Sequence, residues 1–258
     1  MAIMDTFEKV QAQNSMDHWW PRLRDTDVPT PETVRLGIEE TTEFQDGLAL
    51  PLPDEDALTY AIRSVGGPPA FLRSDLTSTK HDMGKGSRVE DTDRAIAHVA
   101  GIVEEHHLAW GMPMPESYYV REWLDLFHHY TAWAYDHHDY PTPVAAEVRY
   151  FINEGEIHDA GFYWPEDAIT RPDRDDWQDL HQNLVRVTHD ARHRLGPHLE
   201  AVCEEFDTGY WSVDFALTED RDWYCIDMAR GEFSWHPEGV EQIRDRSDLV
   251  EDAEGRSQ

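Results

Sequence analysis

The stretch that decides the fold runs from Tyr210 to Gly231 and reads YWSVDFALTEDRDWYCIDMARG. Residues 211–217 and 223–228 are apolar and aromatic runs of strand length, and the five residues between them are polar. Two such runs joined by a short polar connection are typical of a β-hairpin. We therefore expect a hairpin at the centre of the fold.

Each expected strand of this hairpin carries one carboxylate among apolar neighbours, Asp214 in the first and Asp227 in the second. A carboxylate in a buried strand is costly unless it is paired, hydrogen-bonded or bound to a cation. Two carboxylates beside open coordination positions suit Mg²⁺ that is also held by substrate phosphates. The pattern predicts Asp214 and Asp227 as metal ligands. The alternative is that one caps a strand end and the other faces solvent.

Composition narrows the class of protein. The 258 residues include 53 acids and 22 lysines and arginines, a net charge of −31, and only three of the basic residues are lysines, Lys9, Lys80 and Lys85. Dispersed acid with scarce lysine indicates a salt-rich, halophilic cytoplasm, where salt screens self-repulsion. If the protein is viral, a host cytoplasm is expected instead. General binding to a nucleic-acid backbone is not expected without a basic footprint. No apolar run reaches the length of a membrane span, so no membrane partner is expected.

Two of the three lysines lie in the loop 74–87, SDLTSTKHDMGKGS, which follows an expected strand over 70–73. A loop rich in hydroxyls and glycine can present backbone N–H groups and a cation to phosphate. The loop is not a Walker A sequence. The pattern predicts phosphate contacts at Lys80 and Lys85, and the alternative is a solvated loop with incidental lysines.

A second hairpin is expected from residues 144–152 and 156–164, which flank the turn Asn153-Glu154-Gly155. Period-two alternation places Glu147 and Arg149 on one face of its first strand. These two charges either form a cross-strand surface network or line a cleft. A further strand is expected over 118–126.

Helices are expected over 5–24, 54–65, 93–108 and 173–206, the last with a break at Gly196-Pro197. Residues 245–258 are charged, poor in aromatics and typical of a frayed tail. The histidine pairs at 106–107, 128–129 and 137–138 do not predict zinc, because adjacent side chains point apart and none has the i, i+4 spacing with glutamate. No Gly-x-Ser-x-Gly elbow is present, and two cysteines are too few for a disulfide framework.

Together these stretches resemble the ATP-grasp superfamily, in particular its divergent viral and microbial branch with arginine and lysine in altered positions. The resemblance covers roughly residues 28–238 and rests on four stretches: 71–80, 120–124, 147–151, and Asp214 with 227–231. It implies an α+β fold of two subdomains that grip a nucleotide between antiparallel sheets. The implied organisation is a segment 1–66, a nucleotide-binding subdomain 67–125, a C-terminal subdomain 126–240 with the metal site, and a tail 241–258.

The resemblance also implies roles for single residues, with ATP and Mg²⁺ as cofactors. Cofactor binding would fall to one set of residues: Arg73, Lys80, Lys85, Val120, Glu122, Trp123, Leu124, Asp125 and Glu147. Catalysis would fall to another: Lys80, Arg149 and Arg230. Asp214 and Asp227 would hold the metal. The family usually has asparagine where this chain has Ala229, which has no side-chain ligand.

The implied chemistry is phosphoryl transfer from ATP to a carboxylate, which gives an acyl phosphate that an amine attacks. The partners would be small-molecule or peptide carboxylate and amine substrates, and no residue identifies the acceptor. One alternative is a nucleotidyltransferase or RNA-ligase-like enzyme that uses Lys80 or Lys85 for covalent AMP attachment. The usual lysine-x-aspartate/asparagine-glycine signature is absent, because Lys80-His81-Asp82-Met83 lacks the glycine. Another is a non-catalytic nucleotide-binding assembly factor, which Ala229 favours.

Overall fold

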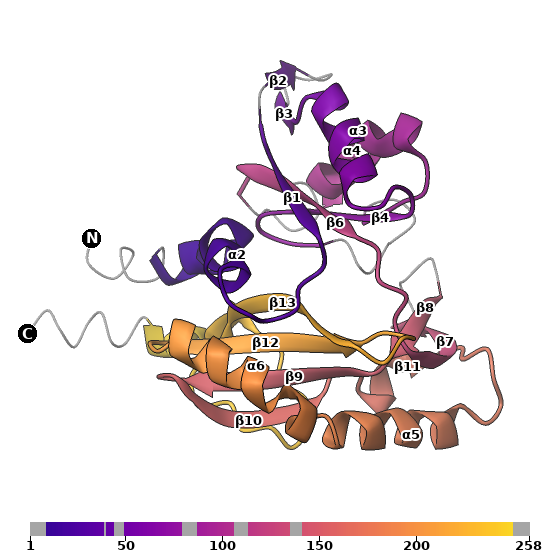
Figure 1. Cartoon of the computed structure of the whole chain (residues 1–258), viewed down its shortest axis with the longest axis vertical. Helices are drawn as coiled ribbons and strands as arrows, with labels where there is room; N and C mark the ends of the chain where they lie inside the picture. Colours follow the sequence, from indigo (N-terminus) through magenta and orange to yellow (C-terminus); the bar gives the residue numbers. More distant parts are fainter. Residues whose placement is uncertain are drawn as a thin grey trace, which may run out of the picture. The chain divides into compact units, whose positions relative to one another are not determined.

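The computed structural model describes residues 9–38, 40–43, 49–78, 87–105, 113–134 and 141–249. The chain divides into two compact units (Figure 1). Unit 1 comprises residues 1–30, 125–136 and 141–258, and unit 2 comprises residues 31–124 and 137–140. The chain thus passes between units at Thr30-Pro31 and again at Leu124-Asp125, and residues 31–66 are grouped with unit 2.

Unit 2 is built on a four-stranded antiparallel sheet in the order β1 (Thr33–Gly37), β6 (Ser117–Glu122), β4 (Ala70–Ser74) and β5 (Arg88–Val89). One face of this sheet is apolar and packs with the helices α3 (Glu55–Ser64) and α4 (Ala95–Val103) in a single core. A short 3-10 turn, η3 (Thr92–Arg94), leads into α4, and β2 (Glu40–Glu43) pairs with β3 (Ala49–Leu52).

Both ends of helix α3 lie close to where the sequence predicts them. Asp54 caps the helix by accepting from the Ala57 backbone N–H, and Gly66 and Gly67 follow with φ of 110° and 87°. Glycine adopts such positive φ without the Cβ clash that other residues meet, which ends the helix. The expected helix over 54–65 is confirmed.

Unit 1 contains the four-stranded antiparallel sheet β10-β9-β12-β13 (Figure 1). Its strands are β9 (Glu147–Asn153), β10 (Glu156–Phe162), β12 (Tyr210–Leu217) and β13 (Trp223–Arg230). Both expected hairpins are confirmed, with β12 at the centre paired to β13 and β9. The β9–β10 turn has positive φ at Glu154 and Gly155, as tight hairpin turns require.

One face of the unit 1 sheet is covered by two helices, α5 (Trp177–His189) and α6 (Arg192–Glu205). Tyr150 and Phe215 meet edge to face there, and Phe206 at the end of α6 contacts Trp211. The helix α2 (Met16–Arg24), capped by Ser15, packs against β13 and α6. A three-stranded sheet of β11 (Ile169–Thr170), β7 (His128–Ala134) and β8 (Thr142–Ala145), with the 3-10 turns η5 (Glu166–Ala168) and η6 (Gly231–Phe233), completes the unit.

The structure corrects the helix expected over 173–206. The break falls at Asp190-Ala191 between α5 and α6, not at Gly196-Pro197. α6 continues through Pro197 because Leu195, Leu199 and Val202 are buried on one side of it, and burial of such an apolar stripe outweighs one missing backbone hydrogen bond.

Other expected elements are shorter than predicted. The strand expected over 118–126 ends at Glu122, and the first helix is interrupted before Ser15. The phosphate loop around Lys80 and Lys85 lies outside the described residues for positions 79–86. Within the described part of the chain, no helix is both long and apolar enough to cross a membrane.

Candidate functional site

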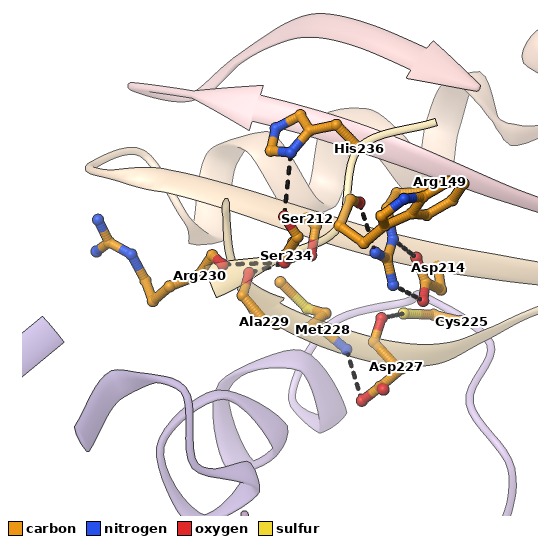
Figure 2. A network of polar contacts seen from close by, with 11 residues as sticks. Arg149, Ser212, Asp214, Cys225, Asp227, Met228, Ala229, Arg230, Ser234 and His236 are labelled. Carbon is orange, nitrogen blue, oxygen red and sulfur yellow. Dashed lines mark hydrogen bonds and ion pairs between the residues drawn. The ribbon is translucent and has the colours of Figure 1, made fainter. Parts of the chain in front are cut away.

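The site is built on one face of the unit 1 sheet, where register aligns three charged residues. Arg149 on β9 lies directly opposite Asp214 on β12, and Asp214 lies directly opposite Asp227 on β13. Residues directly opposite one another in an antiparallel pair present their side chains on the same face. A bulge follows, since Phe215 pairs with Cys225 and leaves Ile226 without an opposite residue. We call this surface the charged face (Figure 2).

Arg149 and Asp214 form a bidentate ion pair. Nε of Arg149 donates to Oδ1 and one terminal N–H donates to Oδ2, both at 2.7 Å. Arg149 is 8% exposed and Asp214 2% exposed, so water reaches neither well. Burial by itself would lower the pKa of Arg149, but the charge and hydrogen bonds of Asp214 raise it above its ordinary value. Arg149 is therefore a permanent cation held in one orientation.

The segment 234–237 covers part of the charged face. The second terminal N–H of Arg149 donates to the Trp235 carbonyl at 2.8 Å, and the hydroxyls of Ser212 and Ser234 are 2.6 Å apart. His236 stacks on Phe151 with ring centroids 4.1 Å apart. Burial lowers the pKa of His236, and the nearby Arg149 charge lowers it further. The segment thus holds Arg149 from the side that faces away from Asp214.

Gly161 on β10 shows how closely this segment approaches the sheet. A Cβ on Gly161 would lie 2.7 Å from the Cβ of Pro237 and 2.8 Å from Cγ2 of Val240. Such distances are shorter than van der Waals contact allows. Glycine at this position is therefore what lets residues 237–240 pack on β10.

Asp227 is the more accessible carboxylate of the charged face. It is half-buried, Oδ1 accepts from the Met228 backbone N–H at 3.1 Å, and its charge helps to raise the pKa of Arg149. Both oxygens of Asp214, in contrast, already accept from a guanidinium. Among the residues that the structure describes, no group of three or more acidic, histidine or cysteine side chains is placed to hold a metal. The residues fit a Mg²⁺ ion that arrives with phosphates and takes Asp227 as its protein carboxylate.

Glu147 stands two residues before Arg149 on the same face of β9. It is buried, and its Oε1 accepts from the Trp164 indole N–H at 3.1 Å. Tyr163, next to Trp164, places its ring 4.9 Å from the Arg149 guanidinium carbon. Of the two alternatives that the sequence left open, an exposed surface network is wrong, because Glu147 and Arg149 are both buried.

Arg230 lies on the other face of the sheet. It is opposite Trp211, which lies three residues before Asp214 and therefore on the other face of β12. Figure 2 shows Arg230 turned away from Arg149. Its guanidinium makes a bidentate pair with Glu232 at 3.1 and 2.7 Å. Gly209, with φ of 84°, makes room for it, since a Cβ there would lie 2.6 Å from the guanidinium. The structure thus separates Arg230 from the charged face.

Unit 2 carries the remaining expected cofactor-binding residues. Val120 is buried in β6, and Arg73 on β4 is 4% exposed with its Nε donating to the Ser74 carbonyl. Glu122 ends β6 and accepts from the Glu32 backbone N–H, and Trp123 stacks with Arg88 at 4.8 Å. Leu124 is half-buried, and Asp125, the first residue back in unit 1, is exposed.

Sequence reasoning missed an arginine-rich face on the unit 2 sheet. Register places Arg35 opposite Tyr119 and Tyr119 opposite Arg73, while Arg121 and Arg88 flank Phe71 in the next row. The four arginines therefore share one face. The period-two spacing of Arg121 relative to Tyr119 was a visible signal, but Arg35 and Arg88 come from strands whose register the sequence does not show.

Comparison with known proteins adds evidence at the level of the fold. No family model and no curated protein matches the sequence. Among solved structures, Cdc123 from Schizosaccharomyces pombe aligns with a TM-score of 0.52 and 14% identity, over 94% of this chain and 92% of that one. A RimK-domain ATP-grasp protein from Sphaerobacter thermophilus aligns with a TM-score of 0.43 and 18% identity, over 86% of this chain and 60% of that one. A biotin carboxylase in complex with β-γ-ATP, from Campylobacter jejuni, aligns with a TM-score of 0.48 and 13% identity, over 94% of this chain and 46% of that one. This chain thus spans less than two thirds of the latter two proteins.

Proposed function

The chain has the ATP-grasp fold, and from this premise we propose that it binds Mg²⁺-ATP on the charged face and phosphorylates a carboxylate for attack by an amine. The observation that carries the proposal is the row Arg149, Asp214 and Asp227 across three adjacent strands. An oriented cation beside an accessible carboxylate is what phosphoryl transfer uses, because positioning and charge neutralisation supply most of its catalysis.

The three residues take different parts in this proposal. Asp227 binds the magnesium ion, which supplies charge neutralisation to the phosphates when it is bound. Arg149 contacts the transferred phosphate, for which it exchanges the Trp235 carbonyl for a phosphate oxygen. Asp214 orients Arg149 through two hydrogen bonds, and it acts as a second metal ligand only where one of those bonds is given up. Arg230 holds Glu232 and stays outside the chemistry.

We also propose nucleotide contacts for the other residues that the resemblance implicates. Arg73, Lys80 and Lys85 contact phosphates, residues 120–124 contact the base and Asp125 the ribose. Glu147 contributes its carboxylate to the charged face. The substrates are a carboxylate and an amine, as small molecules or peptides. Support comes from the fold and from the arginines gathered on one face of the unit 2 sheet.

Titration calorimetry tests the nucleotide site. ATP is titrated into the native chain, Asp227→Asn and Asp220→Asn, each with and without Mg²⁺. Asp220 is the matched control, because it is an exposed carboxylate in the turn of the same hairpin. We expect ATP binding that depends on Mg²⁺. In Asp227→Asn this binding should weaken at least about tenfold, because one charged ligand is lost. In Asp220→Asn it should be unchanged. Equal binding by both variants would remove Asp227 from the site.

Phosphoryl transfer needs a separate assay because the acceptor is unidentified. Candidate carboxylates are incubated with the chain, Mg²⁺-ATP and hydroxylamine, which converts an acyl phosphate to a hydroxamate. Hydroxamate formation that depends on Arg149 supports the ligase. Tight binding of Mg²⁺-ATP without ADP formation with any acid favours the second candidate, a non-catalytic nucleotide-binding protein. Ala229 carries that candidate, because it lies on the charged face opposite Ser212 and offers no ligand.

A further inference from the structure

A cavity of about 410 Å³ lies in unit 1, on the side of the sheet away from the charged face. It is formed where α5 ends, α6 begins and the β12–β13 hairpin turns. Leu217 and Trp223 are opposite each other in that hairpin and are out of phase with Asp214. The cavity lining comprises Val187, Asp190, Ala191, Arg194, Leu217, Arg221 and Trp223. Its volume is in the range of small-ligand sites.

The floor and the rim of this cavity differ in chemistry. Ala191, Leu217 and Trp223 are buried apolar residues, so the floor removes a hydrophobic group from water. Arg194 and Arg221 are exposed cations at the rim. A cavity with an apolar floor and charged rim accepts a ligand that has an apolar body and one charged end.

The sign of the rim charge is unusual for a chain with a net charge of −31. Among the described residues, neither Arg194 nor Arg221 forms an ion pair, although acids outnumber basic residues more than twofold. Asp190 supplies the one carboxylate on the lining, and it is exposed. The two guanidinium groups therefore retain donors for an external oxyanion.

Arg221 is held in a defined position. Its backbone has φ of 72°, in the left-handed region that side chains rarely adopt, and its guanidinium carbon lies 3.8 Å from the centre of the Phe127 ring. Strained backbone that the surroundings maintain is concentrated at ligand sites. Stacking on Phe127 also reduces the freedom that the side chain loses when it binds an anion.

We infer that this cavity binds a small organic carboxylate with an apolar body, its carboxylate between Arg194 and Arg221 and its body on Leu217 and Trp223. The site is separate from the proposed nucleotide site, because its floor residues lie on the opposite face of the same hairpin. The recognition is by charge and shape, so an alcohol or an amine with the same apolar body binds more weakly than the acid.

The test uses 3-phenylpropionate as the probe, with 3-phenylpropanol and 3-phenylpropylamine as matched bodies of different charge. Binding to the full chain is measured by titration calorimetry in the absence of nucleotide. We expect the acid to bind, and the alcohol and amine to bind at least about tenfold more weakly, the value of one charge-assisted contact. Binding of the acid weakens when potassium chloride is raised, because the rim is exposed to screening.

Variants assign the binding to the cavity. Arg194→Gln and Arg221→Gln should each weaken binding of the acid about tenfold or more, which brings its affinity close to that of the alcohol. Arg186→Gln is the control, since Arg186 is an exposed arginine of α5 outside the lining and is hydrogen-bonded to Asn183. Absence of acid binding, equal binding of the three probes, or native affinity in both rim variants would each overturn the inference.

Discussion

Replacing Asp214 with asparagine removes the counter-charge of Arg149 and keeps the size of the side chain. The guanidinium then keeps only neutral acceptors, the Trp235 carbonyl and the amide oxygen of the new asparagine, in a residue that is 8% exposed. Two hydrogen bonds of 2.7 Å are lost or weakened. Hydrogen bonds to charged groups contribute about 1.5–3 kcal/mol each, and breaking a buried ion pair from one side costs about 3–5 kcal/mol.

We therefore expect Asp214→Asn to lower the free energy of unfolding by about 3–5 kcal/mol, a large part of the roughly 5–15 kcal/mol of a typical domain. Urea unfolding followed by circular dichroism measures this loss. Asp220→Asn is the control and should change stability by less than about 0.5 kcal/mol, because it is an exposed turn residue.

A second variant separates the pair from general damage to the sheet. Arg149→Met with Asp214→Leu replaces the ion pair by apolar side chains, and such replacements of buried pairs are often neutral or stabilising. The double variant should be more stable than Asp214→Asn alone. A loss below about 1 kcal/mol in Asp214→Asn, or a double variant less stable than the single one, would refute a buried pair that depends on both charges.

Three further outcomes follow from single contacts. Gly161→Ala should cost about 1–3 kcal/mol of stability by overpacking against Pro237, whereas Gly37→Ala, with open space around its Cβ, should cost clearly less; equal urea midpoints would contradict the close approach. Gly196→Ala should raise stability by about 0.5–1 kcal/mol, because Gly196 is in α6 with no neighbour that a Cβ meets; a lower thermal midpoint would contradict it. Burial lowers the pKa of His236 in the folded state. As the pH falls, the unfolded chain therefore binds a proton at this histidine before the folded chain does. The contribution of neutral His236 to the free energy of unfolding should be fully present above about pH 6.5 and should decrease below it. His236→Phe should flatten that decline in a pH series of urea midpoints, and an unchanged slope would exclude His236 as its source.

The two hairpins and the C-terminus of α3 could be predicted from the sequence. Their signals are local: alternation of apolar residues, a polar or glycine-containing turn, and Gly66-Gly67 after a helical stripe. The α5–α6 break was not predicted, because Gly196 and Pro197 are strong local breakers and the burial that overrides them comes from packing. The position of Arg230 on the face opposite Asp227 could have been predicted from the sequence. The two residues are three positions apart, and side chains alternate between the two faces along a strand.

The sequence by itself determined which residues are carboxylates and cations in strand-forming runs, and hence that Asp214 and Asp227 lie across one hairpin. Only the tertiary structure decided that Arg149, 65 residues before Asp214, neutralises it and leaves Asp227 as the accessible carboxylate. The physical reason is that the β9–β12 register, a long-range pairing, selects the partner of a buried charge. In unit 2, the pairing of β6 with β1 and β4, and of β4 with β5, likewise brings four arginines to one face of the sheet, and no single stretch of sequence contains them all.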